Sequence, residues 1–241
     1  KDQALAAADK AALFKTFAKV VAQRHGLMAT FMAKWSPDYP GQSGHIHLSL
    51  DNIKGGKSAF YDAKAEGGIS PVMRHFIGGQ QALMPELLAL IAPTVNAYTR
   101  LIPGFWAPTE ATWGVDNRTC ALRIIGGGAK SQRVEFRVAA ADANPYLALA
   151  AALGAGLWGI EHGIEPTAPV RGNAYEQGQP KRLALPQSLG EAAQRLQRSN
   201  PARALFGDAF IEHFSASRDW EERQARRAVT DWQLQRYFEI I

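Results

Sequence analysis

The chain has 241 residues, of which 46% are hydrophobic and 20% are charged, as expected of a folded domain with a sizeable core. Lysine and arginine outnumber aspartate and glutamate by 27 to 22, which favours an anionic small-molecule partner but is too small an excess to indicate nucleic acid. The single cysteine, Cys120, excludes an intrachain disulfide and indicates a reducing, cytoplasmic setting. The most apolar run, residues 147–160, is too short to span a bilayer, so no membrane partner is expected.

Residues 5–24 place apolar side chains at helical spacing and predict one amphipathic helix that ends near Gly26. The chain begins without a methionine and enters this helix almost at once, so we expect the sequence to be part of a longer polypeptide. Residues 28–32 are predicted to form a short strand, and the proline-bearing residues 36–43 a loop.

Residues 44–50, GHIHLSL, alternate between polar and apolar side chains. In an extended strand His45, His47 and Ser49 therefore share one face. The two imidazoles would stand about 7 Å apart and could converge on one ligand. Such a pair is either an ordinary surface or core-edge pair or part of a metal site, and a divalent cation would need a further ligand, for which Glu135 is the candidate.

A helix is predicted from Pro71 to about residue 90, after a surface hairpin or loop at residues 51–68, with Ser70 as its N-cap. Residues 96–103 are expected to carry Arg100 into a loop. The segment PGFWAP at residues 103–108 is a defined turn that presents Trp106 at its tip. An exposed tryptophan covers something, which is either a ligand or a neighbouring subunit.

Residues 118–125 are predicted to form a strand that carries Arg118 and Arg123, and residues 133–137, RVEFR, form the next strand. Alternation puts Arg133, Glu135 and Arg137 on one face. A cation held by the carboxylate, together with two guanidinium groups, suits a polyphosphate. The alternative is a solvated strand face that carries an ion triplet.

The rest of the chain is predicted to be mainly helical. Asn144 and Pro145 begin an apolar helix through residue 160, and residues 166–186 form an irregular excursion. Ser188 and Glu191 have the spacing of a capping box before a helix that stops near Asn200. The last forty residues are predicted to be helices.

Several motifs of this chain resemble motifs of the glutamine synthetase family, and they occur in the same order and at approximately the same spacing as in that family. They are GQSGHIHLSL (41–50), RLIPG (100–104), NR (117–118), RVEFR (133–137) and NPY (144–146). The resemblance covers essentially the whole chain, residues 1–241, and is to the C-terminal part of the catalytic domain. It implies an α+β fold, with a curved antiparallel sheet whose polar face is the site and with helices packed outside.

The resemblance also implies an activity, the ATP-dependent joining of the glutamate γ-carboxyl to an amine through γ-glutamyl phosphate. The implied cofactors are ATP and Mg²⁺ or Mn²⁺. His45 and Glu135 match ligands of the metal that accompanies the ATP phosphates. The residues that match nucleotide-binding positions are His47, Ser49, Arg118 and Arg133.

The same resemblance implies the positions that handle glutamate and the transferred phosphoryl group. Arg100 and Arg137 match arginines that hold glutamate, and Gly41 contributes backbone there. Arg118 and Arg123 match arginines around the transferred phosphoryl group. These assignments agree with the physics of phosphoryl transfer, in which positioning and cationic stabilisation supply most of the catalysis.

The sequence departs from the ammonia-using members at Trp106, where they carry a flap glutamate. An indole accepts no proton, but its face can lie against an alkyl chain or a cation. The sequence is therefore similar to relatives that make γ-glutamyl amides of larger amines, such as γ-glutamylputrescine synthetase or γ-glutamylmethylamide synthetase. Glu110 follows nearby, but we do not assign it the flap role.

A second departure is the absence of the family's N-terminal β-grasp domain and of the upstream glutamates that bind the other metal. We therefore expect the 241 residues to be inactive alone. Full-length relatives form homo-oligomers of stacked hexameric rings, which is what the resemblance implies for the whole protein. Two alternatives remain, an ammonia-using enzyme with an altered flap and a family member that has lost its chemistry and serves a structural or regulatory role.

Overall fold

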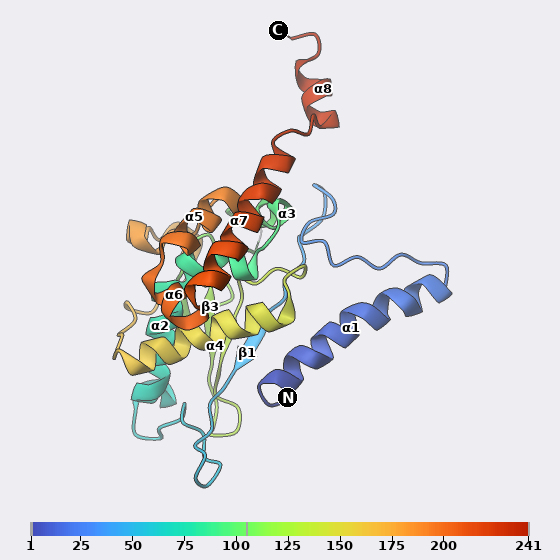
Figure 1. Ribbon diagram of the computed structural model, residues 1–241. Helices are drawn as coiled ribbons and strands as arrows, with labels where there is room; N and C mark the ends of the chain where they lie inside the picture. Colours follow the sequence, from blue (N-terminus) through green and yellow to red (C-terminus); the bar gives the residue numbers. More distant parts are fainter. Residues whose placement is uncertain (1, 105, 241) are drawn as a thin grey trace.

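The computed structural model describes residues 2–104 and 106–240, and its mixture of helices with a small sheet confirms the predicted α+β class (Figure 1). The helices of more than one turn are α1 (Leu5–Arg24), α2 (Pro71–Ile91), α3 (Val95–Arg100), α4 (Pro145–Glu161), α5 (Leu189–Arg198), α6 (Asn200–Phe206), α7 (Asp208–Ala225) and α8 (Asp231–Tyr237). The strands are β1 (Ile46–Leu48), β2 (Trp113–Val115), β3 (Leu122–Ile125) and β4 (Arg133–Phe136). Short 3-10 turns occur at Glu66–Gly68, Ala174–Glu176 and Lys181–Leu183.

The sheet has the strand order β1-β4-β3-β2. β4 runs antiparallel to both β1 and β3, as predicted, but β2 runs parallel to β3, so the prediction of an antiparallel sheet is wrong at this edge. Because β2 is only three residues long, the loop of residues 116–121 has to lead the chain back by only about 7 Å before β3 starts beside it.

Three local predictions need correction. Residues 28–32 do not form a strand, and Met28 is 94% exposed, so this segment lacks the neighbouring strand that would stabilise it. β3 begins at Leu122, which leaves Arg118 in the preceding turn. Arg100 is the last residue of α3, since Thr94 caps a helix that the loop prediction did not include.

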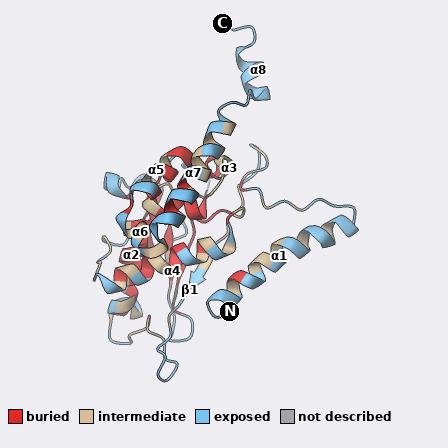
Figure 2. Ribbon diagram, viewed as in Figure 1, coloured by how far each residue is buried: buried red, intermediate tan, exposed pale blue. Residues whose placement is uncertain are grey.

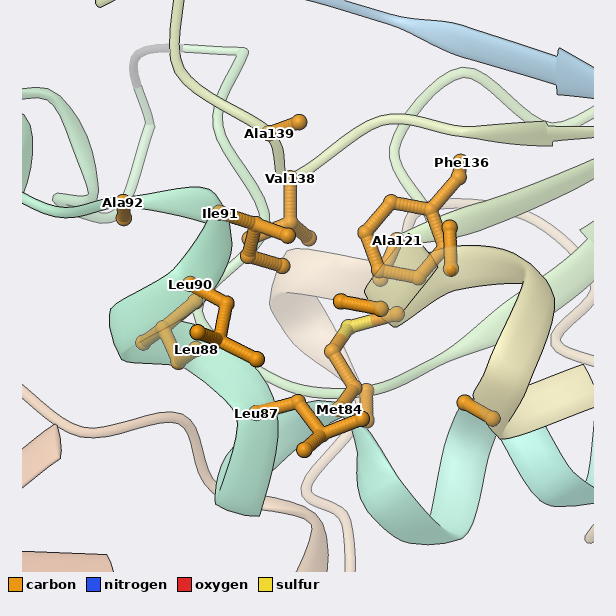
Figure 3. Packing of buried hydrophobic residues seen from close by; sticks show 14 of the residues in the cluster. Met84, Leu87, Leu88, Leu90, Ile91, Ala92, Ala121, Phe136, Val138 and Ala139 are labelled. Carbon is orange, nitrogen blue, oxygen red and sulfur yellow. The ribbon is translucent and has the colours of Figure 1, made fainter. Parts of the chain in front are cut away.

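The core lies between the sheet and the helices α2 and α4, and Figure 3 shows side chains of α2 packed against Phe136 and Val138. Glycines let these two helices approach closely. A Cβ at Gly159 would overlap the carbonyl oxygen of His75 and lie 2.6 Å from Cα of Gly79. The side chains of Ser70 and Asn144 cap α2 and α4, as predicted, so local sequence begins both helices that support the sheet.

Two helices project from this core. α1 and α8 are drawn away from the body of the molecule in Figure 1, and Figure 2 shows α8 exposed along its length and α1 mostly exposed with some intermediate residues. Ala8 is the buried residue of α1, and α8 has none among the residues described. In the described part of the chain, no helix combines the length and the apolar character needed to cross a membrane.

Candidate active site

The register of the sheet puts three predicted site residues in one row. Glu135 of β4 lies opposite His47 of β1 on one side and opposite Arg123 of β3 on the other. The next row, which contains Leu48, Val134 and Ile124, is buried in the core. The alternation predicted from the sequence is therefore correct, and strand pairing converts it into a polar face with Glu135 at its centre.

Glu135 is the carboxylate around which the basic side chains of this face are arranged. Its side chain is 5% exposed, and its two oxygens accept hydrogen bonds from Arg137 Nη1 at 3.1 Å and from Arg123 Nη1 at 3.2 Å. Burial by itself would raise the pKa of Glu135, but the charge of Arg137 and the neighbouring His45 and Arg123 outweigh burial and hold that pKa below its usual value. The carboxylate is thus ionised at neutral pH. Removal of either partner would leave a buried charge uncompensated.

The two histidines approach the same carboxylate. Nδ1 of His45 lies 3.0 Å from Glu135 Oε1, and Nε2 of His47 lies 3.9 Å from it. Burial and the charge of Arg137 lower the pKa of His45 to about 4, and burial followed by the charges of Arg133 and Arg123 lowers the pKa of His47 despite the opposing Glu135. Both imidazoles are therefore neutral at pH 7, the form in which a histidine can bind a metal.

Arg133 positions His47 from the neighbouring strand. Its Nε donates to His47 Nδ1 at 3.1 Å, and its Nη1 donates to the Ser131 carbonyl at 2.9 Å. Because Nδ1 of His47 accepts a hydrogen bond, the proton of this neutral ring is assigned to Nε2. Arg133, His47 and Ser49 also line a cavity of about 760 Å³ at this end of the sheet, which agrees with their grouping as nucleotide-binding candidates.

Arg100 approaches the face from α3. It is 5% exposed, its Nη2 donates to the Val138 carbonyl, and burial lowers its pKa to about 10, so it stays protonated at neutral pH. Its Nε is buried without a hydrogen-bond partner in the described chain. A Cβ at Gly41 would overlap Arg100 Cγ and come 2.8 Å from the Ala33 carbonyl oxygen. Gly41 thus allows the close approach of Arg100, a role that the sequence did not reveal.

Asp116 is a site residue that the sequence analysis missed. Arg123 donates to Asp116 Oδ1 through Nε at 3.0 Å and through Nη2, so Arg123 bridges Asp116 and Glu135. The pair Asp116-Asn117 is typical of turns, and the backbone of Asp116 is left-handed with φ of 50°. This turn-forming composition was the signal in the sequence that could have pointed to Asp116.

Arg118 and Trp106 are not among the described side chains that contact Glu135. Arg118 is exposed and lines, with Arg123, a cavity of about 1200 Å³ beside β2. Trp106 is 67% exposed and has φ of 57°, a region that bulky residues seldom adopt. The structure thus brings together His45, His47, Arg123, Arg133, Glu135 and Arg137, and it leaves Arg118 and Trp106 at the surface.

His45 and Glu135 fit one part of a divalent-metal site. Their nearest atoms are 3.0 Å apart, which matches two adjacent ligands of an octahedron with metal distances of about 2.1 Å. Residues 2–104 and 106–240 contain no group of three or more histidine, cysteine, aspartate or glutamate side chains arranged to hold a metal. Mg²⁺ commonly takes only one or two protein carboxylates and completes its shell with water and phosphate oxygens, so a partial donor set is compatible with it.

Comparison with known proteins decides the family. The family model of the glutamine synthetase catalytic domain matches residues 1–237. The chain belongs to the glutamine synthetase family. This confirms the resemblance on which the assignments of the site residues were based.

Named relatives in this family differ in what they act on. The chain is 46% identical to type-1 glutamine synthetase 2 of Dictyostelium discoideum, over 99% of this chain and 46% of the relative. It is 45% identical to γ-glutamylethanolamide synthetase of Streptomyces coelicolor, over 99% of this chain and 50% of the relative. It is 41% identical to glutamate–isopropylamine ligase of a Pseudomonas species, over 100% of this chain and 52% of the relative.

Solved structures in the glutamine synthetase family have the same fold. The ADP complex of GmaS superimposes with a TM-score of 0.89 and 34% identity, covering 99% of this chain and 55% of the GmaS chain. The ligand-free form of GmaS gives a TM-score of 0.85, with 33% identity over 96% and 53% of the two chains. This glutamine synthetase-type chain therefore spans about half the length of the curated relatives it matches.

Proposed function

We propose that the complete protein in which this chain occurs is an ATP-dependent ligase that joins the γ-carboxyl of glutamate to an organic amine. The observation that carries the proposal is the row of His47, Glu135 and Arg123, in which one buried carboxylate organises imidazole and guanidinium groups on a single face. A cationic face of this kind suits a reaction whose substrates are ATP and a dicarboxylate.

The proposed reaction has two steps. The glutamate γ-carboxylate attacks the γ-phosphorus of ATP, which releases ADP and forms γ-glutamyl phosphate. The amine then attacks the acyl carbon, the C–O bond to phosphate breaks, and the amine proton that is lost goes to a base or to water. Both steps develop negative charge on phosphate oxygens, which positioned arginines stabilise.

Residues of this chain are assigned to the two steps by their place on the face. Arg100 and Arg137, both buried, are proposed to hold the glutamate carboxylates beside Gly41. Arg118, Arg123 and Arg133 are proposed to bind the phosphates of ATP, with His47 and Ser49 at the nucleotide. His45 and Glu135 would hold a divalent cation such as Mg²⁺ or Mn²⁺, which when bound neutralises phosphate charge.

The choice of an organic amine depends on Trp106. Its side chain is exposed on the loop between Pro103 and Pro108, where an indole can cover an alkyl chain but cannot deprotonate ammonium. Two relatives, a γ-glutamylethanolamide synthetase and a glutamate–isopropylamine ligase, support an organic amine. An ammonia-using enzyme is the alternative, and the glutamine synthetase among the relatives supports it.

We further propose that these residues are the C-terminal part of the catalytic domain, completed in the whole protein by an N-terminal β-grasp domain and upstream metal-binding glutamates. The whole protein is proposed to assemble as stacked hexameric rings. The exposed apolar side chains of α1 and α8 support an assembled form, because exposed apolar surface of this kind is typical of contacts between subunits. The 241 residues alone are then expected to release no phosphate from ATP.

The test is phosphate release from ATP by the complete protein with glutamate and Mg²⁺, comparing ammonium, methylamine, ethanolamine and putrescine. Preference for an organic amine supports the proposal, and preference for ammonium would mean that Trp106 was over-interpreted. Release with none of them would favour the non-catalytic alternative.

A variant at Glu135 tests the site directly. Glu135→Gln should lower kcat/KM for the preferred amine by about 100-fold or more, because Arg123 and Arg137 lose the anion that they share. The exposed Glu161→Gln on α4 is the matched control and should leave the rate unchanged.

A further inference from the structure

Arg123 is held by two carboxylates that come from different parts of the chain. Its Nη1 donates to Glu135 Oε2 at 3.2 Å, while its Nε donates to Asp116 Oδ1 at 3.0 Å and its Nη2 donates to the same oxygen. Within the described part of the chain, these bonds engage three of the five N–H groups of the guanidinium and leave two for a ligand. Asp116 therefore accepts more of the hydrogen bonds that orient Arg123 than Glu135 does.

Glu135 alone does not fix the orientation of Arg123, because it also contacts other side chains of the same face. Its Oε1 accepts from Arg137 Nη1 at 3.1 Å and lies 3.0 Å from His45 Nδ1. A guanidinium held through one nitrogen can still rotate about that hydrogen bond, whereas a second carboxylate on its Nε side removes this freedom. Asp116 is ionised at neutral pH, because the hydrogen bond and the charge of Arg123 lower its pKa.

The turn that carries Asp116 is fixed on both sides. The N–H of Asp116 donates to the Ile124 carbonyl at 2.8 Å, which extends the pairing with β3 by one residue beyond the end of β2. The Asn117 side chain donates to the Gly172 carbonyl at 2.8 Å and accepts from the Thr119 N–H at 3.0 Å. These bonds hold Asp116 in the left-handed backbone region, with φ of 50°, which aspartate tolerates better than most residues do. The turn thus presents a preorganised carboxylate to the guanidinium.

The pair of Asp116 and Arg123 is too exposed to contribute much to stability. The side chain of Asp116 is 71% exposed and that of Arg123 is 16% exposed. Ion pairs in contact with water stabilise a fold only slightly, because water screens them and two flexible side chains have to be held in one geometry. Both side chains line the cavity of about 1200 Å³ that Arg118 also lines. The position of the pair is therefore better explained by an effect on a ligand than by an effect on folding.

We propose that Asp116 is a positioning residue, which orients the Arg123 guanidinium toward the transferred phosphoryl group and acts through Arg123 without contacting a substrate itself. The inference rests on the proposed function, in which Arg123 binds phosphate, and deepens it by assigning the residue that orients this arginine. Positioned guanidinium groups stabilise the charge that develops during phosphoryl transfer, and a misdirected group loses most of this effect. Asp116 therefore acts on kcat more than on the binding of glutamate or of the amine.

The test measures steady-state kinetics of the complete protein with ATP, glutamate and the amine that it uses best. Asp116→Asn introduces a residue that tolerates the left-handed backbone but removes the charge that orients Arg123. It should lower kcat by about tenfold, the loss expected for a hydrogen bond between charged groups, and leave KM for glutamate and for the amine unchanged. Asp219→Asn is the matched control, because Asp219 forms an exposed ion pair with Arg223 on α7 and should leave kcat unchanged.

A second variant tests whether Asp116 acts through Arg123. Arg123→Lys keeps the positive charge, so that a rate can still be measured, but it lacks the Nε donor and the planar group that Asp116 orients. Asp116→Asn should therefore lower kcat by less than about twofold when it is added to Arg123→Lys. The urea midpoint of unfolding of Asp116→Asn should equal that of the unmodified protein, because the pair contributes little to stability.

The outcomes separate this inference from the proposed function. The positioning role would be overturned, with the ligase activity intact, by an unchanged or raised kcat in Asp116→Asn, by a change confined to KM, or by an equal loss in the Arg123→Lys background. A fall in kcat that a lower urea midpoint accounts for would also overturn it. Absence of phosphate release by the unmodified protein with every amine would overturn the proposed function, and this inference with it. A lower kcat at unchanged KM that disappears in the Arg123→Lys background supports the role of Asp116.

Discussion

The paired helices α2 and α4 differ from α1 in what surrounds them. α2 buries most of its residues between the sheet, α4 and α5, whereas α1 leaves Leu13, Phe14 and Phe17 between 55% and 64% exposed (Figure 2). All three sequences form regular helices of 17 to 21 residues. Helix formation was therefore a local property, whereas burial depended on the presence of a partner element.

A few specific contacts hold α1 to the rest of the chain. Lys15 Nζ donates to the carbonyls of Ala141 and Ala143 at 2.9 Å, and Phe14 packs edge-on against Phe31 with 5.9 Å between ring centroids. These contacts fix the position of α1 without covering its apolar side chains. The difference from α2 and α4 can be tested by substitutions that act on one region and spare the other.

The largest expected effect is in the contact between α2 and α4. Gly159→Ala should destabilise the fold by about 3 kcal/mol, because the new Cβ meets the backbone of His75 and Gly79, which cannot move aside easily. Gly154→Ala on the same helix is the matched control, since its Cβ would lie 3.7 Å from Leu205, an ordinary contact. The control should be neutral or stabilising by up to about 1 kcal/mol. Urea unfolding measures both, and equal effects would contradict the tight packing.

An intermediate effect is expected for thiol reactivity. Cys120 is fully buried, and burial raises its pKa to about 11, so the reactive thiolate is about 100-fold rarer at pH 8 than in an ordinary cysteine. In a Val21→Cys variant the new thiol on α1, at a position 51% exposed, should be alkylated far faster than Cys120 in the same molecule. Site-resolved mass spectrometry after iodoacetamide treatment measures both rates. Comparable rates would show that the loop of residues 116–121, which contains Cys120, opens readily, and unfolding in urea should remove the difference.

The smallest expected effect is on α1 itself. Phe17→Ser should change the free energy of unfolding of this chain by less than about 0.5 kcal/mol, because Phe17 is 58% exposed. Self-association should fall, since an exposed apolar side chain has been removed. Sedimentation velocity measures association, and Phe17→Leu, which keeps an apolar side chain, is the control. A large loss of stability would mean that the apolar side of α1 is covered in solution.

Much of the local structure was predictable because it depends on neighbours in sequence. Ser70, Asn144 and Ser188 cap their helices as expected, although the Glu191 carboxylate accepts from Gln187 N–H instead of completing the capping box with Ser188. The segment 28–32 was predicted wrongly because β-propensity has no effect without a strand to pair with.

The site likewise has features that the sequence predicted and features that it did not. The alternation of residues 44–50 and 133–137 determined which side chains share a face, because side chains in a strand point to opposite faces in turn. Which residues meet across strands was decided only by the register, which set His47 and Arg123 on either side of Glu135. The partnership of Asp116 with Arg123 likewise depends on the parallel pairing of β2 with β3.

The amino-acid sequence by itself determined the helices and their caps, the alternating faces of the strands and the identity of the charged groups. These features depend on interactions between residues a few positions apart. The tertiary structure decided the direction of β2, the burial of Glu135 among its arginines, the exposure of α1 and the pairing of Asp116 with Arg123. Each of these depends on contacts between residues far apart in the chain, which local preferences leave open.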